Sequence, residues 1–301
     1  MTNPALTIGI LHPGDMGHHV GRVLLAGGAA VLVALADRSA RTRDFARAGG
    51  LLDVGDVDAL VARADLVLSI VVPGAALDVA EQVAAAALRT KRSPVFVDFN
   101  AVSPATARRA EAILTAAGAR FVDGCILGPP PRPEVPTTFV VSGEAAPTCR
   151  PLAQLGLTLQ EIEGPVGQAS ALKMCFGALS KGIAGLTGEL LIAAERFGVA
   201  GELDAALQTH LPMQLRAAMG SAPAMPAKAH RWIAEMREVA ATFQEVGLPG
   251  ASFEGLAGFF ALIAQTPLGQ TRPDGPAPPR ALGELARELS EAVTAIEGER
   301  D

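Results

Sequence analysis

The first half of the chain alternates short apolar runs with alanine-rich amphipathic stretches, and this alternation limits the possible folds more than any other feature. The runs, such as "DLVLSIVV" (65–72), lack the regular polar–apolar alternation of a half-exposed strand. Strands that are apolar on both faces are typical of parallel sheets covered by helices on either side. We therefore predict a doubly wound α/β domain with a mostly parallel sheet, whose strands lie at 6–11, 30–36, 65–72, 94–100, 120–127, 137–143 and 157–162.

After Glu163-Gly164-Pro165 the pattern becomes purely helical. An unusually long helix is predicted from about 168 to 197, and segments rich in Pro and Gly separate the helices predicted after it. This change predicts a Rossmann-type domain over 1–164 and an all-helical domain over 165–301. Wide apolar faces on the helices favour a homodimer through the second domain. The later helices are predicted at about 202–219, 226–246, 252–265 and 280–298.

Composition argues against several classes of protein. The 301 residues carry a formal charge of −6, and no run of Lys or Arg supplies a surface for nucleic acid. Cys125, Cys149 and Cys175 form no CxxC pair and have no His at ligand spacing, so we expect small buried thiols and no metal site. The N-terminal apolar run has no basic segment before it and meets His12 and Pro13 too early for a signal core or a membrane span. We expect a cytoplasmic protein without a membrane partner.

The segment "GILHPGDMG" (9–17) follows the first predicted strand and opens a predicted helix. Alignment with the dinucleotide fingerprint G-x-G-x-x-G places His12, Gly14 and Gly17 at the three glycine positions. The second glycine lets the backbone approach a pyrophosphate and the third lets the helix pack on the strand, but a histidine replaces the first, which makes the tight turn. A helix that begins near Asp15 would still direct its N–H groups at a diphosphate. We predict a variant dinucleotide turn, with a plain structural turn as the alternative, formed by His12, Pro13, Gly14, Asp15, Met16 and Gly17.

The segment "ADRSART" (36–42) lies where the adenosine ribose of a dinucleotide would bind. Asp37 could accept a hydrogen bond from a ribose 2′-hydroxyl, which favours NAD. Arg38, Ser39 and Arg41 could instead hold a 2′-phosphate, which favours NADP. We favour NADP because three donors outnumber one acidic group, and a solvated loop is the alternative for the two arginines.

Several segments, in this order along nearly the whole chain, resemble the β-hydroxyacid dehydrogenase and 6-phosphogluconate dehydrogenase superfamily. They are "GILHPGDMG", "DRS" (37–39), "SIVVPGAA" (69–76), "DFNAVSPATA" (98–107), "VDGCILGPP" (122–130) and "GPVGQASALKMCFGALSKG" (164–182). The "HPGDMG" turn, "NAVSPAT" (100–106) and "RWIAEM" (231–236) look most like a branch whose C-terminal domain has no assigned function. The resemblance implies an NAD(P)-dependent oxidoreductase.

The resemblance also implies roles for single residues. Asn100 is expected beside the nicotinamide and the substrate, and Lys173 is expected to be the catalytic lysine. A lysine in the apolar run "ASALKMCFGAL" is costly to bury in charged form, so we expect burial to lower its pKa. A Lys173 side chain that reaches solvent along the helix is the alternative, and Lys181 is a second acid–base candidate. The nicotinamide side of the cofactor is expected to border Val71, Val72 and Pro73.

The chain departs from the superfamily pattern at the expected substrate site. Where relatives carry a Ser and a Gly-Gly pair for the substrate carboxylate, this chain has Leu127, Gly128 and Pro129. Four residues after the lysine, Gly177 replaces the usual Asn. We therefore expect either a substrate other than the usual short hydroxy acids or an anionic group held elsewhere. Leu127, Gly128 and Gly177 remain expected substrate contacts, together with Lys173.

The segment "KAHRWIAEMREVAATF" (228–243) offers another place for the anionic group. Helical spacing puts Trp232, Glu235, Met236 and Val239 on one face, next to Arg231. Arg231 is expected to pair with an anionic substrate, and Trp232 is expected to form a wall of its pocket. The alternative is a core or dimer face, with Arg231 and Glu235 in surface ion pairs.

Together these residues predict hydride transfer between a nicotinamide and a carbon that bears a hydroxyl or carbonyl. Lys173 would act as general acid or base, and Asn100 would orient the reacting oxygen. Imine reduction is one alternative, although imine reductases usually have another residue at the position of Lys173. A nucleotide-binding sensor without turnover is the other alternative.

Overall fold

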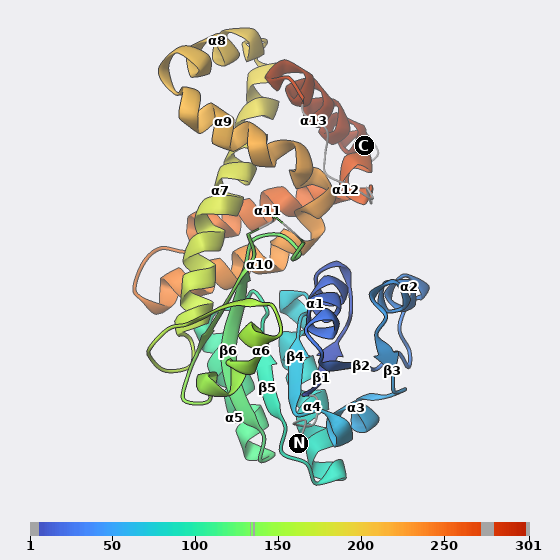
Figure 1. The fold of residues 1–301 in the computed structure, drawn as a ribbon. Coiled ribbons are helices and arrows are strands. Elements are labelled where there is room, and N and C mark those ends of the chain that lie inside the picture. The colour runs from blue at the N-terminus through green and yellow to red at the C-terminus, as the bar shows by residue number, and fades with distance from the viewer. Residues whose placement is uncertain (1–5, 133, 135, 272–279, 299–301) are drawn as a thin grey trace. The chain divides into compact units, whose positions relative to one another are not determined.

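The computed structural model describes residues 6–132, 134, 136–271 and 280–298. The chain divides into two compact units, Met1–Met174 and Cys175–Asp301. This division falls inside the long helix α7 (Gln168–Arg196), whereas the predicted boundary at residue 164 lies in the loop before it. The change from α/β to helical structure occurs as the sequence predicts (Figure 1).

The first unit contains one sheet with the strand order β3-β2-β1-β4-β5-β6-β7-β8. Its first six strands follow the 3-2-1-4-5-6 order of doubly wound dinucleotide-binding folds. All neighbouring strands are parallel except the antiparallel pair β6 and β7. The strands are β1 (Thr7–Leu11), β2 (Ala30–Val33), β3 (Leu52–Asp53), β4 (Leu66–Ser69), β5 (Val95–Asp98), β6 (Arg120–Leu127), β7 (Thr138–Ser142) and β8 (Thr158–Glu161).

Both faces of this sheet are buried, which explains the apolar runs in the sequence. Ile10 and Leu68 belong to a core shared with Val20 and Leu24 of α1 (Asp15–Ala26), and α2 (Ala40–Gly49) and α6 (Pro151–Gln154) contribute to the same core. Phe96 belongs to the core on the other face, which is covered by α3 (Val57–Arg63), α4 (Ala76–Thr90) and α5 (Pro104–Ala116). The connections between parallel strands therefore bring the carboxyl ends of β1, β4, β5 and β6 to one edge of the sheet.

The second unit is helical. Its longest pair, α10 (Met225–Glu245) and α11 (Ala251–Gln265), packs in antiparallel fashion, because Trp232 meets Phe260 and Phe243 meets Phe253. The helix predicted over 202–219 is in fact two helices, because Pro212 starts a new one. The remaining elements are α8 (Ala200–His210), α9 (Pro212–Ser221), α12 (Pro267–Gln270) and α13 (Leu282–Glu297).

Helix α7 is the one helix among the described residues that is long and apolar enough to cross a membrane by length and composition alone. Core helices of globular proteins pass the same test. Its first turns belong to the core of the first unit, where Ala169 and Met174 are fully buried. The helix also contains Lys173 and Lys181, each of which makes a polar contact within the protein.

The expectation of three buried thiols is wrong for one of them. Cys125 and Cys149 are buried, and burial raises the pKa of each thiol to about 12. Cys175 is exposed, because it lies on an outward face of α7 beside the exposed side chains of Leu172 and Phe176.

Candidate dinucleotide site

The turn between β1 and α1 is tight even though a histidine replaces the first fingerprint glycine. His12 has a φ of +60°, in the left-handed region, and its carbonyl accepts a 2.7 Å hydrogen bond from the N–H of Gly14. Histidine is among the non-glycine residues that enter this region more readily than most. His12 thus adopts the backbone conformation for which the fingerprint normally uses glycine.

The two remaining fingerprint glycines differ in what surrounds them. A Cβ on Gly17 would lie 3.2 Å from the carbonyl oxygen of His12, so Gly17 serves the packing of α1 against the turn. A Cβ on Gly14 would meet no described protein atom closer than 4.0 Å, and the φ of Gly14 is −78°. Neither packing nor backbone conformation therefore requires glycine at residue 14. A ligand that approaches the backbone there would require it, as a pyrophosphate does.

The start of α1 is suited to an anion. Gly14 is its N-cap and provides no side-chain hydrogen bond to the first-turn N–H groups. Such N–H groups and the helix dipole together favour phosphate oxygens. Pro13 is buried and Met16 packs against the core, so these two residues shape the turn. Asp15 is exposed at the first position of the helix.

The loop after β2 brings one arginine to this turn. Nη1 of Arg38 contacts Nε2 of His12. Burial, and then the charge of Arg38, lower the pKa of His12 to about 4. The imidazole is therefore neutral at physiological pH, and its Nε2 accepts a hydrogen bond from the guanidinium.

The neighbours of Arg38 have other contacts. Ser39 caps α2, and its Oγ accepts a 3.2 Å hydrogen bond from the N–H of Thr42. The guanidinium of Arg41 lies over the ring of Phe45, 5.4 Å from its centroid. Asp37 lies four residues beyond the end of β2, exposed and at a φ of +57°. Of the three proposed phosphate donors, Arg38 is the one that contacts the dinucleotide turn.

Asn100 holds together the loops after β4 and β5. Its side chain is buried, Oδ1 accepts a 2.6 Å hydrogen bond from the N–H of Val71, and Nδ2 donates to Oγ of Ser69 at 2.9 Å. These bonds fix the path of residues 70–72. Val72 is left 52% exposed, as a residue that borders an apolar ring would be, and Pro73 starts the short 3-10 helix η1 (Pro73–Ala75). The structure thus gives Asn100 a positioning role, and its contact with a substrate remains a prediction.

A carboxylate that the sequence analysis did not single out fastens the start of α7. Asp123, in β6, is fully buried. Its Oδ2 accepts hydrogen bonds from the N–H groups of Gly167 (2.8 Å) and Ser170 (3.1 Å) and from Oγ of Ser142 (2.9 Å). Oγ of Ser142 in turn accepts from the N–H of Ala169 at 3.0 Å. The N–H groups at the start of α7 therefore find acceptors in the sheet, and the negative charge complements the helix dipole.

This anchor determines where Lys173 lies. Lys173 follows the anchored turn by less than one further turn of α7, and its Nζ donates a 2.7 Å hydrogen bond to the carbonyl of Ile126 near the end of β6. The side chain is half-buried. Lys173 is thus held beside Leu127 and Gly128, at the sheet edge that also carries the dinucleotide turn.

The structure requires glycine at residue 128 whether or not a substrate binds there. Its φ is +107°, and a Cβ there would lie 2.5 Å from the carbonyl oxygen of Pro136. The close approach of the two backbone segments that flank the β6–β7 connection therefore requires glycine. A contact of Gly128 or Leu127 with substrate remains a prediction.

In the helical unit, the candidate residues mainly serve the packing of the helices. Trp232 packs edge-on against Phe260, with ring centroids 5.3 Å apart, and Arg231 is exposed. Glu235 forms no surface pair, contrary to the alternative considered above. It is buried, and its Oε1 lies 2.9 Å from Nζ of Lys181, whose side chain is only 14% exposed. Gly177 lies next to this ion pair, because a Cβ there would be 3.3 Å from Glu235 Oε1.

Lys181 is a poor acid–base candidate, because its ammonium is engaged in the buried ion pair with Glu235. Lys173, which lies at the same sheet edge as the dinucleotide turn, is the better candidate. The sequence could not reveal this pairing, because the two residues lie on different helices and 54 positions apart.

Among the described residues, one group could offer ligands to a metal ion. Asp15, His18 and His19 present one ligand atom each, within 4.8 Å of one another. The group lies at the N-terminal turn of α1, where the positive end of the helix dipole disfavours a cation. Burial also lowers the pKa of His18. Nothing else at this turn points to a metal.

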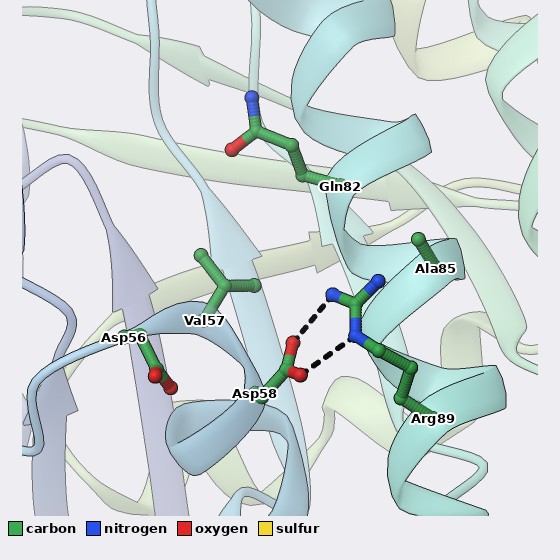
Figure 2. A pocket seen from close by; sticks show the side chains of 6 residues that line it. All are labelled: Asp56, Val57, Asp58, Gln82, Ala85 and Arg89. Atoms are coloured by element: carbon green, nitrogen blue, oxygen red, sulfur yellow. Dashed lines mark hydrogen bonds and ion pairs between the residues drawn. The ribbon is translucent and has the colours of Figure 1, made fainter.

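A surface hollow elsewhere in the first unit contains none of the predicted site residues. Figure 2 shows Arg89 of α4 in a paired contact with Asp58 of α3. The two N–O distances are 2.6 and 2.7 Å. Both side chains are substantially exposed, so solvent screens the ion pair and it contributes little to stability. This hollow is lined by Asp56, Val57, Asp58, Gln82, Ala85 and Arg89.

The strand order, the open space over Gly14 and the cation beside the turn define an NAD(P)-binding domain of the Rossmann type. Residues 7–152 match the family described as the NAD binding domain of 6-phosphogluconate dehydrogenase, and residues 194–263 match a domain of unknown function, DUF1932. Both matches fit the resemblance to the 6-phosphogluconate dehydrogenase superfamily seen in the sequence.

Individual proteins resemble the chain to different degrees. An uncharacterized 28.5 kDa protein of Methanothermus fervidus is 31% identical over 166 residues, which span 55% of this chain and 62% of that protein. A conserved hypothetical protein of Sinorhizobium meliloti 1021 is 25% identical, with a TM-score of 0.67 and coverage of 97% of both chains.

Two enzymes share the fold at lower identity. The 3-hydroxyisobutyrate dehydrogenase of Mycobacterium tuberculosis has a TM-score of 0.68 at 19% identity, over 95% of this chain and 99% of its own. An imine reductase of Myxococcus stipitatus in complex with NADP+ has a TM-score of 0.55 at 21% identity, over 86% and 93%. The fold is therefore that of NAD(P)-dependent hydroxyacid dehydrogenases and imine reductases.

Proposed function

We propose that this protein is an NADP-dependent dehydrogenase or reductase that acts on a hydroxyl or carbonyl carbon of a small anionic substrate, with Lys173 as general acid–base. The observation that carries the proposal is the position of Lys173 Nζ, held 2.7 Å from the Ile126 carbonyl at the same sheet edge as the dinucleotide turn. A bound nicotinamide dinucleotide would supply or accept the hydride. The chain would bind it through His12–Gly17 and the loop of Arg38.

Lys173 would exchange the proton of the reacting oxygen. A neutral amine takes the proton of an alcohol during oxidation, and an ammonium donates one during carbonyl reduction. The hydrogen bond to the Ile126 carbonyl holds Nζ at the sheet edge where the substrate is proposed to bind. The bonds of Asn100 to Val71 and Ser69 would keep the loop beside the nicotinamide fixed during this exchange.

The preference for NADP rests on Arg38. Its guanidinium lies next to the dinucleotide turn. Asp37, the residue that would favour NAD, is exposed and has a left-handed backbone conformation. An arginine at this loop offers several N–H donors to a 2′-phosphate.

A homodimer is proposed from the surface of α7. Exposed apolar side chains repeat along this helix at spacings of four, three and seven residues, as in a helix that packs lengthwise on another. They include Leu172 (37% exposed), Phe176 (46%), Leu179 (69%) and Leu186 (61%). Light scattering coupled to size exclusion tests this proposal. A dimeric wild type that becomes monomeric in Leu179→Glu supports it, and a monomeric wild type contradicts it.

The function itself is tested by NADPH and NADP+ absorbance changes with panels of hydroxy acids, oxo acids, alcohols and imines. Wild-type turnover of a hydroxy or oxo acid should fall by about 10²–10⁴-fold in Lys173→Ala, while NADPH affinity stays within about two-fold. Lys181→Ala is the matched control and should leave kcat within a few-fold of the wild type if it folds. Turnover of imines alone would favour imine reduction. NADPH binding without any turnover, unchanged in Lys173→Ala, would favour a sensor.

A further inference from the structure

His12 and Arg38 come from two neighbouring loops of the first unit. His12 directly follows β1, Arg38 follows β2, and these strands pair in parallel, with Ile10 opposite Val33. The side chains meet through Nε2 of His12 and Nη1 of Arg38. The contact therefore joins the turn expected to hold the diphosphate to the loop expected to hold the adenosine ribose.

The backbone alone does not explain a histidine at residue 12. Its φ of +60° is readily adopted by glycine, which is the usual residue at this fingerprint position. The side chain must therefore contribute something that glycine lacks. The contact that the structure shows for the imidazole is the one with Arg38.

Two buried nitrogen atoms of this pair have no hydrogen-bond partner among the described residues. They are Nδ1 of His12 and Nε of Arg38. Because Nε2 of the neutral imidazole accepts from Arg38, Nδ1 carries the ring proton, so both unpartnered atoms are donors. A buried donor without an acceptor is unfavourable, and a phosphate oxygen would satisfy it.

We propose that His12 is a specificity-determining residue for NADP, which holds the Arg38 guanidinium in place for the adenosine 2′-phosphate. In this arrangement the imidazole would restrain Arg38 from the diphosphate side, and phosphate oxygens would supply the acceptors that the two buried donors lack. The replacement of the first fingerprint glycine by His12 would then link the diphosphate site to the 2′-phosphate site. This inference rests on the proposed NADP-binding function.

The test compares the affinities of NADPH and NADH by fluorescence titration for a set of variants. His12→Gly restores the ordinary fingerprint residue and suits the left-handed backbone. We expect it to weaken NADPH binding by about ten-fold or more and to leave NADH binding within about two-fold. Arg38→Ala should show the same pattern, and the double variant should bind NADPH no more weakly than Arg38→Ala alone, because the two residues act as one unit.

Two conservative variants of His12 test the roles of its two ring nitrogens separately. His12→Gln keeps an acceptor close to the position of Nε2 and should retain much of the preference for NADPH. His12→Asn tolerates the left-handed backbone but is too short to reach Arg38, and it should behave like His12→Gly. Thermal unfolding of each variant shows whether the fold is kept. His19→Ala, in α1 after the turn, is the control and should bind both nucleotides like the wild type.

The outcomes distinguish this inference from the function on which it rests. If the wild type prefers NADPH and Arg38→Ala abolishes the preference while His12→Gly keeps it, the role of His12 is refuted and the proposed function stands. If His12→Gly and Arg38→Ala have independent, additive effects, the coupling is refuted. If the wild type binds neither nucleotide, the proposed function fails, and the role of His12 fails with it.

Discussion

Oγ of Ser170 donates a 2.5 Å hydrogen bond to Oδ1 of Asp123, and this contact joins the first turn of α7 to the middle of the sheet. Both residues are fully buried. Because the same carboxylate also accepts backbone hydrogen bonds from Gly167 and Ser170, it fixes both the direction of the helix and the place of Lys173 on it.

Asp123→Asn should therefore be strongly destabilising. The substitution removes the negative charge and replaces one of the two acceptor oxygens with an NH₂ group, which cannot accept the hydrogen bonds made there, and we expect a loss of about 2–4 kcal/mol in the free energy of unfolding. Urea denaturation measures this loss. Asp44→Asn, which removes an exposed partner of Arg47, is the control and should cost less than about 0.5 kcal/mol. Equal stability of the two variants would contradict the anchoring role of Asp123.

Gly14→Ala should weaken NADPH binding and leave stability nearly unchanged, whereas Gly27→Ala should lower stability and leave NADPH binding nearly unchanged. Gly14→Ala should leave the stability within about 0.5 kcal/mol of the wild type but weaken NADPH binding at least ten-fold, because the added methyl meets space that only a ligand would fill. Gly27→Ala should cost about 1–3 kcal/mol, since its Cβ would lie 2.4 Å from the carbonyl oxygen of Leu155.

Thermal melts and nucleotide titrations of both variants test this pair. The affinity of Gly27→Ala for NADPH should stay near that of the wild type at a temperature where the variant is folded. A Gly14→Ala variant that binds NADPH normally would show that no ligand approaches the turn.

The elements with a strong pattern were predictable from the sequence, and those held by distant contacts were not. Strands such as β5 and β6 follow directly from their long apolar runs, and the sheet is doubly wound as predicted. β3 was missed because it has two residues, both exposed. The apolar pattern continues through Pro212, so the sequence pattern predicts one helix where the structure has two.

In the candidate site, too, residues with a local sequence pattern were predictable and contacts between distant residues were not. The turn at Gly14 and Gly17 has a local signature, and Lys173 is recognisable as a charge in an apolar run. Asp123 offered a comparable signal, because a carboxylate inside the buried strand "RFVDGCIL" must find hydrogen-bond donors. Its partners, however, lie up to 47 residues away. The contact between His12 and Arg38 likewise depends on the pairing of β1 with β2.

His12 should make stability depend on pH. Because burial and the charge of Arg38 lower its pKa from 6.5 to about 4, the unfolded chain binds more protons than the folded protein between these values. Stability should therefore fall as the pH drops from about 6.5 towards 4, and the contribution of His12 is about 1–2 kcal/mol after allowance for partial exposure.

Urea unfolding of wild type and His12→Gln between pH 4.5 and 7.5 isolates this contribution. The wild type should lose more stability than the variant on acidification, although both keep His18, whose pKa is lowered in the same direction. Parallel pH profiles would show that His12 is not kept neutral in the folded state.

The three thiols should differ in reactivity. Cys175 is exposed in the single chain, on the face of α7 proposed for dimer contact, and should react rapidly with DTNB in the monomeric Leu179→Glu variant. Burial raises the pKa of Cys125 and Cys149 to about 12 and excludes the reagent. We expect one fast thiol in Leu179→Glu and none when Cys175→Ala is added, and denaturant should expose the other two thiols. Rapid reaction of the Cys175→Ala variant would contradict the burial of the remaining thiols.

The most direct test of the central claim is a parallel fluorescence titration of the wild-type protein with NADPH and NADH. The account predicts saturable binding of both nucleotides at one site, with NADPH at least about ten-fold tighter and the difference removed by Arg38→Ala. Binding of neither nucleotide would contradict it, because the turn at His12–Gly17 would then be a structural turn and Lys173 would have no hydride chemistry to serve.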